Sequence, residues 1–308
     1  MLDQEDFETT LEHAYNNAKS KKERESIVHL QKFISNNFKE MEISHFQRLY
    51  ENIDDSLKGT FNLQYRMHPD INEVIEQFYR EDGGLKCGLI TPVDLGVDDP
   101  DVSNPASRYH GINIPGLISP ENHVLFIDTE SPEMQDGFSR INYGEINIVD
   151  KILRKFSESD SFHAYLERFS KEEDRQVGII SFYGKQVRQL RNVARQHTDI
   201  PTRVSTVDRF QGMERNIVIV SMVRSDKIES TMNQEPDFEK YPQLGYPRQK
   251  SLGFAQSPNR LNVALSRAKR LLIIVGNQKH FSNLEIYRRL FLVITNNVHD
   301  RVLSEKEL

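Results

Sequence analysis

The chain has 308 residues, of which 37% are hydrophobic and 28% charged, so it is long enough for a large packed domain beneath a heavily charged surface. Its formal net charge of -6 excludes the whole-chain basic balance of many nucleic-acid binders and leaves only local basic patches for such contacts. Cys87 is the only cysteine, which excludes a disulfide framework or a cysteine-rich metal site within one chain.

The N-terminal sequence has neither the basic nor the apolar region of a signal peptide. No apolar run reaches the length of a membrane span. We therefore expect a soluble intracellular protein, in the cytoplasm or the nucleus, with no membrane partner.

The first part of the chain, residues 1–58, is charged and poor in Gly and Pro, and Ile27, Leu30 and Ile34 recur at helical spacing, which predicts helices. A further helix is predicted from Pro69, since proline suits a first turn and the apolar residues that follow share one face. Residues 82–120 are rich in Gly, Pro, Asp and Asn, which predicts an irregular excursion.

From residue 123 onward, short β-branched runs alternate with helical segments. Strands are predicted at 123–127, 177–180, near Val204, and at 217–220 and 271–275, with helices from 145, 185 and 260. Strands that are apolar on both faces predict a mainly parallel α/β sheet whose functional loops gather at the carboxyl ends of the strands. The polar, turn-prone residues 226–252 predict a surface insertion.

Three segments carry unusual combinations of side chains, at Leu63–Pro69, Ser205–Arg215 and Asn259–Lys269. In a helix over 260–269, Arg260 and Arg267 share one face while leucines and alanines cover another. Arginine holds phosphate oxygens with a planar fork, so this face suits a phosphate. For this helix alone, a salt-bridged surface face is the simpler interpretation.

The order Q-Y-R-M-H-P, then T-V-D-R-F-Q-G-M-E, then R-L-N-V-A-L-S-R-A-K resembles the motifs of the second motor lobe of superfamily 1 helicases of the nonsense-decay and maturation-factor type. The match runs from about Leu63 to Asn277, and the segments Ser139–Glu145 and Val177–Gln186 support it. The resemblance implies a RecA-like, P-loop NTPase-type α/β fold for residues 59–308. Residues 1–58 would then join it to a first lobe.

The resemblance also implies roles around ATP. Arg66 and Arg267 would be catalytic, as two arginines that reach the γ-phosphate and stabilise charge on the transferring phosphoryl group. Tyr65 would lie against the base or sugar, and Glu214 would bond the ribose or help sense the γ-phosphate. Gly212 would permit close backbone approach. Packing and a helix cap are the alternative roles for Tyr65 and Glu214.

Contacts to single-stranded DNA or RNA are implied as well, mostly through its backbone. The implied residues are Ser181, Tyr183, Gln186, Ser205 and Thr206. An arginine stripe on the helix from residue 185 suits a phosphate backbone, although a solvated face explains it equally; it consists of Arg188, Arg191 and Arg195. Departures from the family pattern, at Phe182, Asn216 and Asn259, leave the ATP-facing residues intact.

The string G-x-x-x-x-G-K-[ST] does not occur in the chain, nor does an Asp-Glu magnesium pair upstream of residue 63. In the family these belong to the first lobe, N-terminal to this one. We therefore expect an ATP-dependent helicase or translocase that uses ATP and Mg²⁺ only together with that lobe and is inactive alone. A non-catalytic nucleic-acid-binding module or a partner-binding scaffold remain the alternatives. No metal site is expected, because His68 and His110 lack partners at ligand spacing.

Overall fold

The computed structural model describes residues 14–15, 17–30, 49–50, 52–59, 61–89, 105–136, 139–226, 228–229 and 252–308. The chain divides into two compact units, Met1–Phe61 and Asn62–Leu308. In the first unit, residues 21–30 are helical and Asp55–Leu57 form the short 3-10 helix η1. The rest of this account concerns the second unit.

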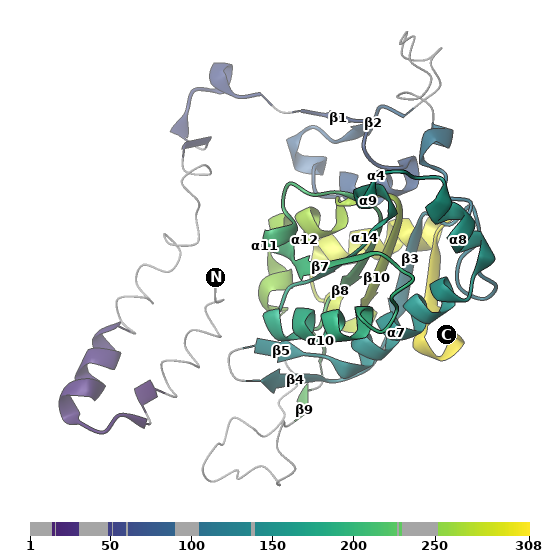
Figure 1. The fold of residues 1–308 in the computed structure, drawn as a ribbon. Coiled ribbons are helices and arrows are strands. Elements are labelled where there is room, and N and C mark those ends of the chain that lie inside the picture. The colour runs from purple at the N-terminus through teal and green to yellow at the C-terminus, as the bar shows by residue number, and fades with distance from the viewer. Residues whose placement is uncertain are drawn as a thin grey trace. The chain divides into compact units, whose positions relative to one another are not determined.

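A six-stranded sheet, parallel throughout, forms the centre of the second unit, in the order β11-β3-β10-β8-β6-β7. Its strands are β3 (Val124–Asp128), β6 (Val177–Ser181), β7 (Thr202–Thr206), β8 (Arg215–Ser221), β10 (Ala268–Gly276) and β11 (Arg301–Ser304) (Figure 1). The predicted parallel α/β sheet is confirmed. The edge strand β11 was not predicted, because its four residues form no continuous apolar run.

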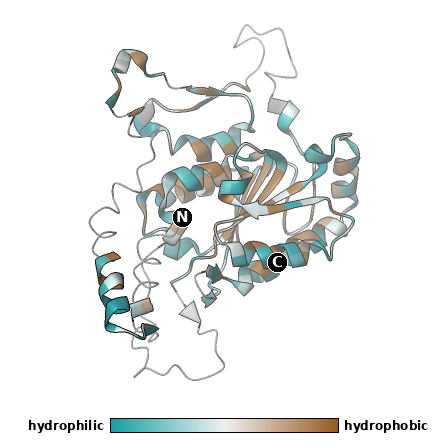
Figure 2. Cartoon of the chain, turned by 60° about the vertical axis from the view of Figure 1, so that its left-hand side comes forward, coloured by the Kyte–Doolittle hydropathy of each residue, from teal (hydrophilic) through white to brown (hydrophobic). Residues whose placement is uncertain are grey.

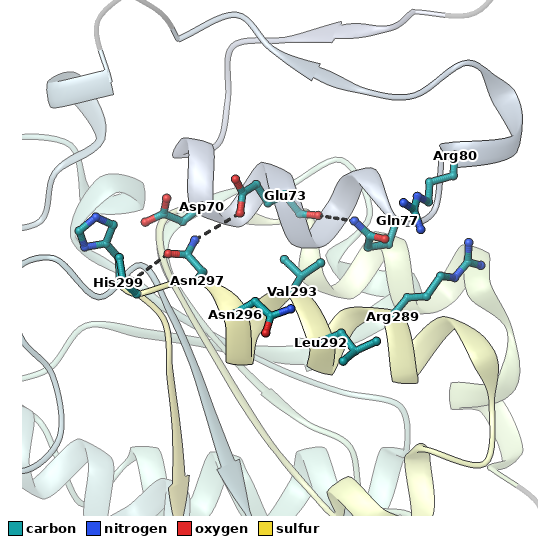
Figure 3. Close-up of a pocket in the computed structure, with 11 residues that line it drawn as sticks. Asp70, Glu73, Gln77, Arg80, Arg289, Leu292, Val293, Asn296, Asn297 and His299 are labelled. Carbon is teal, nitrogen blue, oxygen red and sulfur yellow. Dashed lines mark hydrogen bonds between the residues drawn. The ribbon is translucent and has the colours of Figure 1, made fainter.

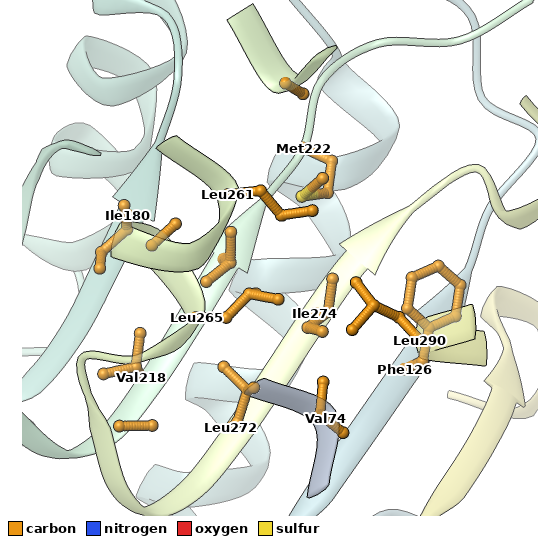
Figure 4. Close-up of a cluster of buried hydrophobic side chains, with 14 of the residues drawn as sticks. Val74, Phe126, Ile180, Val218, Met222, Leu261, Leu265, Leu272, Ile274 and Leu290 are labelled. Atoms are coloured by element: carbon orange, nitrogen blue, oxygen red, sulfur yellow. The ribbon is translucent and has the colours of Figure 1, made fainter. Parts of the chain in front are cut away.

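Both faces of the sheet are buried, as the β-branched runs predict. On β8, Val218 and Val220 join one hydrophobic cluster, and Ile217 and Ile219 join the other. The same alternation runs along β3 and β10, because successive side chains of a strand point to opposite faces. Figure 4 shows the first cluster, and the colouring in Figure 2 shows hydrophobic residues concentrated in the strands.

Helices cover each face of the sheet. One cluster contains side chains of α4 (Pro69–Glu76), α11 (Val207–Phe210), α12 (Pro258–Leu265), α13 (Gln278–Phe281) and α14 (Glu285–Asn296). The other contains those of α7 (Tyr143–Ser157), α8 (Asp160–Glu167) and α10 (Gly184–Ala194). The short α9 (Glu172–Arg175) buries no side chain.

The predicted helix over 260–269 ends earlier than expected. Its last residue is Leu265, and Ser266 caps it by donating its backbone N–H to the Asn262 carbonyl. From Ala268 the chain pairs with β8 as β10, so Arg267 lies in the turn between helix and strand. Arg260 and Arg267 therefore do not share a helix face. Strand pairing with β8 has displaced the last turn that helical periodicity predicted.

Smaller elements surround the sheet. β1 (Leu63–Gln64) pairs in parallel with β2 (Lys86–Cys87), and β4 (Glu133–Asp136) pairs with β5 (Ser139–Ile141) and β9 (Ile228–Glu229). Short 3-10 helices lie at η2 (Arg80–Asp82), η3 (Pro105–Arg108), η5 (Gly253–Gln256) and η6 (Glu305–Glu307). Most of the predicted insertion and residues 90–104 of the predicted excursion lie outside the described residues. No helix in the described ranges is long and apolar enough to cross a membrane.

Candidate functional site

Arg66, Glu214 and Lys269 form an ion-pair triad from three distant parts of the chain. Arg66 Nε lies 2.6 Å from one carboxylate oxygen of Glu214, and Lys269 Nζ lies 2.7 Å from the other. Partial burial acts to raise the pKa of Glu214, but the hydrogen bond and charge of Lys269, together with Arg66, outweigh it and lower that pKa. Glu214 is therefore anionic at neutral pH.

Arg267 lies beside this triad. Both it and Arg66 bond Ser266: Arg66 donates to the Ser266 carbonyl at 3.3 Å, and Arg267 to the Ser266 hydroxyl at 3.0 Å. Burial, and then the like charge of Arg66, lowers the pKa of Arg267, although a guanidinium remains charged at neutral pH. Three cations thus lie around the Glu214 carboxylate, and a second carboxylate, Asp174, lies 3.8 Å from Lys269 Nζ, so the cations outnumber the carboxylates.

A side-chain-supported turn presents Tyr65 and Arg66. The Gln64 side-chain oxygen accepts from the backbone N–H groups of Arg66 and Met67, each at 2.8 Å. Met67 is buried, while Tyr65 and Arg66 are half-buried. The turn therefore anchors one side chain in the core and leaves the two preceding ones at the surface.

Gly212 has a φ of 81°, in the left-handed region that favours glycine. Nothing in the described part of the chain lies within 4 Å of a Cβ built at this position. The backbone conformation of the turn before Glu214 therefore explains this glycine within the domain. The predicted close approach of a ligand remains a prediction.

The four cationic and anionic residues lie at the edge opposite to the one predicted. Glu214 immediately precedes β8, and Arg267 precedes β10, so both lie at the amino ends of neighbouring parallel strands. We expected functional loops at the carboxyl ends. The motif that contains Arg267 lies before its strand and not after it, so these residues gather at the amino ends of the strands.

Four of the five residues implied to contact nucleic acid have buried side chains, and their contact to nucleic acid stays a prediction. Ser181 donates to the Ser221 carbonyl at 2.9 Å, and Gln186 donates to the Ser221 hydroxyl at 2.9 Å. The Tyr183 hydroxyl accepts from Arg224 at 3.1 Å, and Ser205 is 3% exposed. Ser181, Tyr183 and Gln186 thus bond other side chains and carbonyls of the domain.

Thr206, in contrast, is half-buried at the end of β7, where it precedes α11 without a side-chain capping bond. Its contact to nucleic acid stays a prediction. The three arginines of the predicted stripe are exposed: Arg188 and Arg191 lie on α10, and Arg195 is its C-cap residue. Arg191 donates two hydrogen bonds to the Val204 carbonyl, at 3.2 Å each.

Buried carboxylates at the carboxyl-end edge escaped sequence analysis. Glu145 is fully buried, accepts from the Ser221 hydroxyl at 2.6 Å and from the Val223 N–H at 2.8 Å, and burial raises its pKa to about 8. Val223 has a φ of 73°, an uncommon conformation for a β-branched residue. Glu133 pairs with Arg224 at 3.0 Å. The burial of Glu145 could not be predicted, because a carboxylate in the first turn of an amphipathic helix is usually solvated.

Histidines gather at the start of β3. His68, Asp70 and His123 have potential ligand atoms within 4.8 Å of one another, so His68 does have partners that sequence spacing missed. The rings of His68 and His123 are stacked at 3.3 Å with an interplanar angle of 10°. Parallel rings direct their nitrogen lone pairs side by side, away from a common point, and His123 Nδ1 already contacts the Arg270 carbonyl at 2.6 Å. Stacking, and not metal ligation, fits this geometry.

A groove of about 630 Å³ lies between α4 and α14. Figure 3 shows Asp70 and Glu73 toward one end and Arg80 and Arg289 toward the other. None of Arg66, Glu214 and Arg267 lines it. The groove is therefore separate from the cationic site.

Comparison with known proteins identifies relatives of this domain. A family model described as an AAA domain matches residues 41–279. The chain is 30% identical over 277 residues to the DNA replication ATP-dependent helicase/nuclease dna2 of Schizosaccharomyces pombe, which covers 87% of this chain and 17% of that protein. It is 29% identical over 236 residues to the regulator of nonsense transcripts 1 homolog of Drosophila melanogaster, covering 74% of this chain and 16% of the relative.

A third relative is the DNA polymerase alpha-associated DNA helicase A of Saccharomyces cerevisiae, 30% identical over 227 residues, covering 70% of this chain and 27% of the relative. The chain thus spans less than a third of the length of each of these three proteins. The matches agree with the motif order and with the parallel sheet. The chain therefore belongs to the AAA domain family, as a superfamily 1 helicase domain of the Upf-like type.

Proposed function

We propose that this domain is the C-terminal motor lobe of an ATP-dependent superfamily 1 helicase or translocase. In this role Arg66 and Arg267 reach the γ-phosphate of ATP that a first lobe binds. One observation carries the proposal: both arginines bond the same residue, Ser266, beside a carboxylate that already holds Arg66. Two neighbouring guanidiniums can stabilise the negative charge that develops on a transferring phosphoryl group.

The donor set fits a polyphosphate. Arg66, Arg267 and Lys269 face two carboxylates, Glu214 and Asp174, the latter 3.8 Å from Lys269 Nζ, so the group still carries a surplus of positive charge. Arg66 and Glu214 are both more than a third exposed, which leaves them accessible to a ligand. The oxygens of Glu214 are already taken by Arg66 and Lys269, so Mg²⁺, which neutralises phosphate charge, would be held by residues of the first lobe.

Glu214 has a definite task in this proposal. Without phosphate, its two oxygens hold Arg66 and Lys269 in place, which keeps both cations from collapsing onto other acceptors. When a phosphate arrives, Arg66 exchanges a singly charged carboxylate for a more highly charged anion. Lys269 remains to neutralise Glu214, which lowers the repulsion between this carboxylate and the phosphate.

Nucleic acid would bind at the carboxyl-end edge of the sheet, opposite to the arginines. Thr206 and the backbone N–H groups there, with the arginine stripe on α10, offer contacts to a phosphate backbone without reading sequence. The separation of the two edges supports a motor in which ATP and single-stranded DNA or RNA bind at different ends of the same strands.

The test is hydrolysis of ATP by this domain joined to a first lobe that carries a phosphate-binding loop, with and without single-stranded nucleic acid. We expect stimulated hydrolysis that Arg267→Ala abolishes while ATP binding is retained. Hydrolysis that Arg267→Ala leaves unchanged would contradict the motor proposal. Nucleic-acid binding without any hydrolysis would favour a non-catalytic binding module that keeps the fold.

A further inference from the structure

Arg108 holds the loop that carries Tyr65 and Arg66, although it belongs to none of the three motifs. Its Nε donates to the Arg66 carbonyl at 2.7 Å, and one terminal nitrogen donates to the Tyr65 carbonyl at 2.9 Å. The other terminal nitrogen donates to the Ser107 hydroxyl at 3.1 Å. A planar fork that takes two consecutive carbonyls fixes the orientation of that backbone as well as its position.

The loop is thereby held from both sides. Gln64 accepts from the N–H groups of Arg66 and Met67, while Arg108 donates to the carbonyls of Tyr65 and Arg66. All four of these hydrogen bonds are made by side chains and none by the backbone of a neighbouring strand. The direction in which Arg66 leaves the backbone therefore depends on Gln64 and Arg108.

Arg108 directs its guanidinium at the backbone of the Tyr65–Arg66 loop and at Ser107. Burial lowers its pKa, and the nearby carboxylate of Glu214 acts in the opposite direction. Each of its three guanidinium nitrogens already donates to an oxygen of Tyr65, Arg66 or Ser107. Arg108 therefore holds the backbone of the loop in place.

Gly88 supports the same loop at the Tyr65 ring. A Cβ built at Gly88 would lie 2.4 Å from Tyr65 Cε1, a distance that forces the ring to move. The Gly88 N–H also donates to the Gln64 carbonyl at 2.7 Å, which holds the two segments together. The φ of Gly88 is not in the left-handed region, so an alanine there strains the ring contact and not the backbone.

We propose that Arg108 and Gly88 are positioning residues of the nucleotide site: Arg108 aims Arg66 at the phosphate, and Gly88 sets the plane of the Tyr65 ring against the nucleoside. This inference rests on the proposed function. It assigns a task to two residues of the segment over 82–120, whose sequence indicates only an irregular excursion. Gly88 and Arg108, from either end of that segment, hold the loop that we propose to face ATP.

The two residues have separable effects. Loss of Arg108 lets a catalytic cation drift, and a displacement of about 1 Å in such a group costs roughly a hundredfold in rate. Lysine at 108 keeps a charge but has no planar fork, so it can restore only part of the geometry. A methyl group at 88 displaces a ring that touches substrate equally in the ground and transition states, which weakens binding and not the chemical step.

The experiment uses the domain joined to a first lobe, with kcat and KM for ATP as readouts. We expect Arg108→Ala to lower kcat by about ten- to a hundredfold with KM little changed, and Arg108→Lys to recover part of the loss. Gly88→Ala should raise KM severalfold with kcat retained. Arg168→Ala is the matched control, because Arg168 also donates to a backbone carbonyl, that of His110 at 3.0 Å, outside the site.

Arg267→Ala in the same protein separates this inference from the proposed function. If Arg267→Ala leaves hydrolysis intact, the proposed function fails. If Arg267→Ala abolishes hydrolysis while both Arg108 variants keep the unaltered kcat, the positioning role is overturned and the motor proposal stands. The positioning role is also overturned if Arg168→Ala lowers kcat as much as Arg108→Ala does, with an equal drop in the thermal midpoint. Should Arg108→Ala not fold, Arg108→Lys decides, since it keeps the charge and most of the volume.

Discussion

Glu214 Oε2 accepts a 2.6 Å hydrogen bond from Arg66 Nε, across 148 residues of sequence. The other oxygen of the same carboxylate contacts Lys269 at 2.7 Å. A residue whose implied role is to bond ribose or sense phosphate thus also holds Arg66, the arginine that we propose to reach phosphate. The predictions below start from this pair.

Glu214→Gln keeps the shape of the side chain and removes its charge. We expect a drop of about tenfold or more in kcat for ATP hydrolysis in the joined protein, because Arg66 and Lys269 lose the anion that orients them. Stability should change by less than about 1 kcal/mol, since the pair is more than a third exposed. The control Glu285→Gln, in the surface pair with Arg288, should leave kcat unchanged.

Arg66→Ala and Arg267→Ala should each reduce kcat by roughly a thousandfold, the range of an arginine finger. If both guanidiniums act on one phosphate, as we propose, the double variant should lose far less than the product of the single losses. The measurement is a double-mutant cycle on kcat. Fully multiplicative losses would mean that the two arginines act on separate steps.

Gln186→Ala tests whether this side chain supports the fold or contacts nucleic acid. Its amide is fully buried and donates to the Ser221 hydroxyl while accepting from the Asn142 N–H, at 2.9 Å each. We expect a loss of about 1–3 kcal/mol in the free energy of unfolding, measured with urea, because buried partners are left unpaired. Gln189→Ala, half-buried on the same helix, is the control and should cost little.

The arginine stripe on α10 gives a salt-dependence prediction. If these side chains neutralise phosphates, Arg188→Ala should weaken single-strand binding and reduce the slope of log K against log salt by about 0.7. Arg154→Ala serves as the control, since Arg154 is exposed on α7 and pairs with Asp150 at 2.7 Å. An unchanged slope for Arg188→Ala would assign the stripe to the solvated surface.

Stability should fall in mild acid. Burial, opposed by a hydrogen bond to the Asn122 carbonyl, lowers the pKa of His110 to about 4. Between its ordinary value of 6.5 and about 4, the unfolded chain binds a proton that the folded domain does not, so stability decreases as pH falls through this window. The full contribution is on the order of 3 kcal/mol, of which about 2 kcal/mol is lost by pH 5. Urea unfolding at pH 7.5 and 5.0 should show a smaller difference for His110→Gln than for the unaltered chain.

The same unfolding series separates His110 from the other histidines. The exposed His29→Gln should leave the pH difference as it is. Burial also lowers the pKa of His123, to about 4, and that of His68, to about 2, so part of the acid sensitivity should survive the single substitution. Complete loss of the pH dependence in His110→Gln would contradict this division.

The sequence by itself determined the fold class, and its family resemblance picked out the residues that we propose to face ATP. The continuous apolar runs of β3, β8 and β10 are local patterns, and a strand that is apolar on both faces must lie inside a sheet. Three motifs in a fixed order then singled out Arg66, Glu214 and Arg267 without reference to coordinates. What periodicity overestimated was the helix at 260–269, because pairing with β8 begins at Ala268.

Only the tertiary structure decided what each of these side chains touches. The contacts of Glu214 with Arg66 and Lys269 depend on the register of β8 with β10 and on the loop after β1, which no local pattern encodes. The burial of Ser181 and Gln186 depends on the packing of whole elements, and the grip of Arg108 on the Tyr65–Arg66 backbone depends on a returning loop. Propensity and periodicity act over a few residues, whereas these partners are brought together only when the sheet is complete.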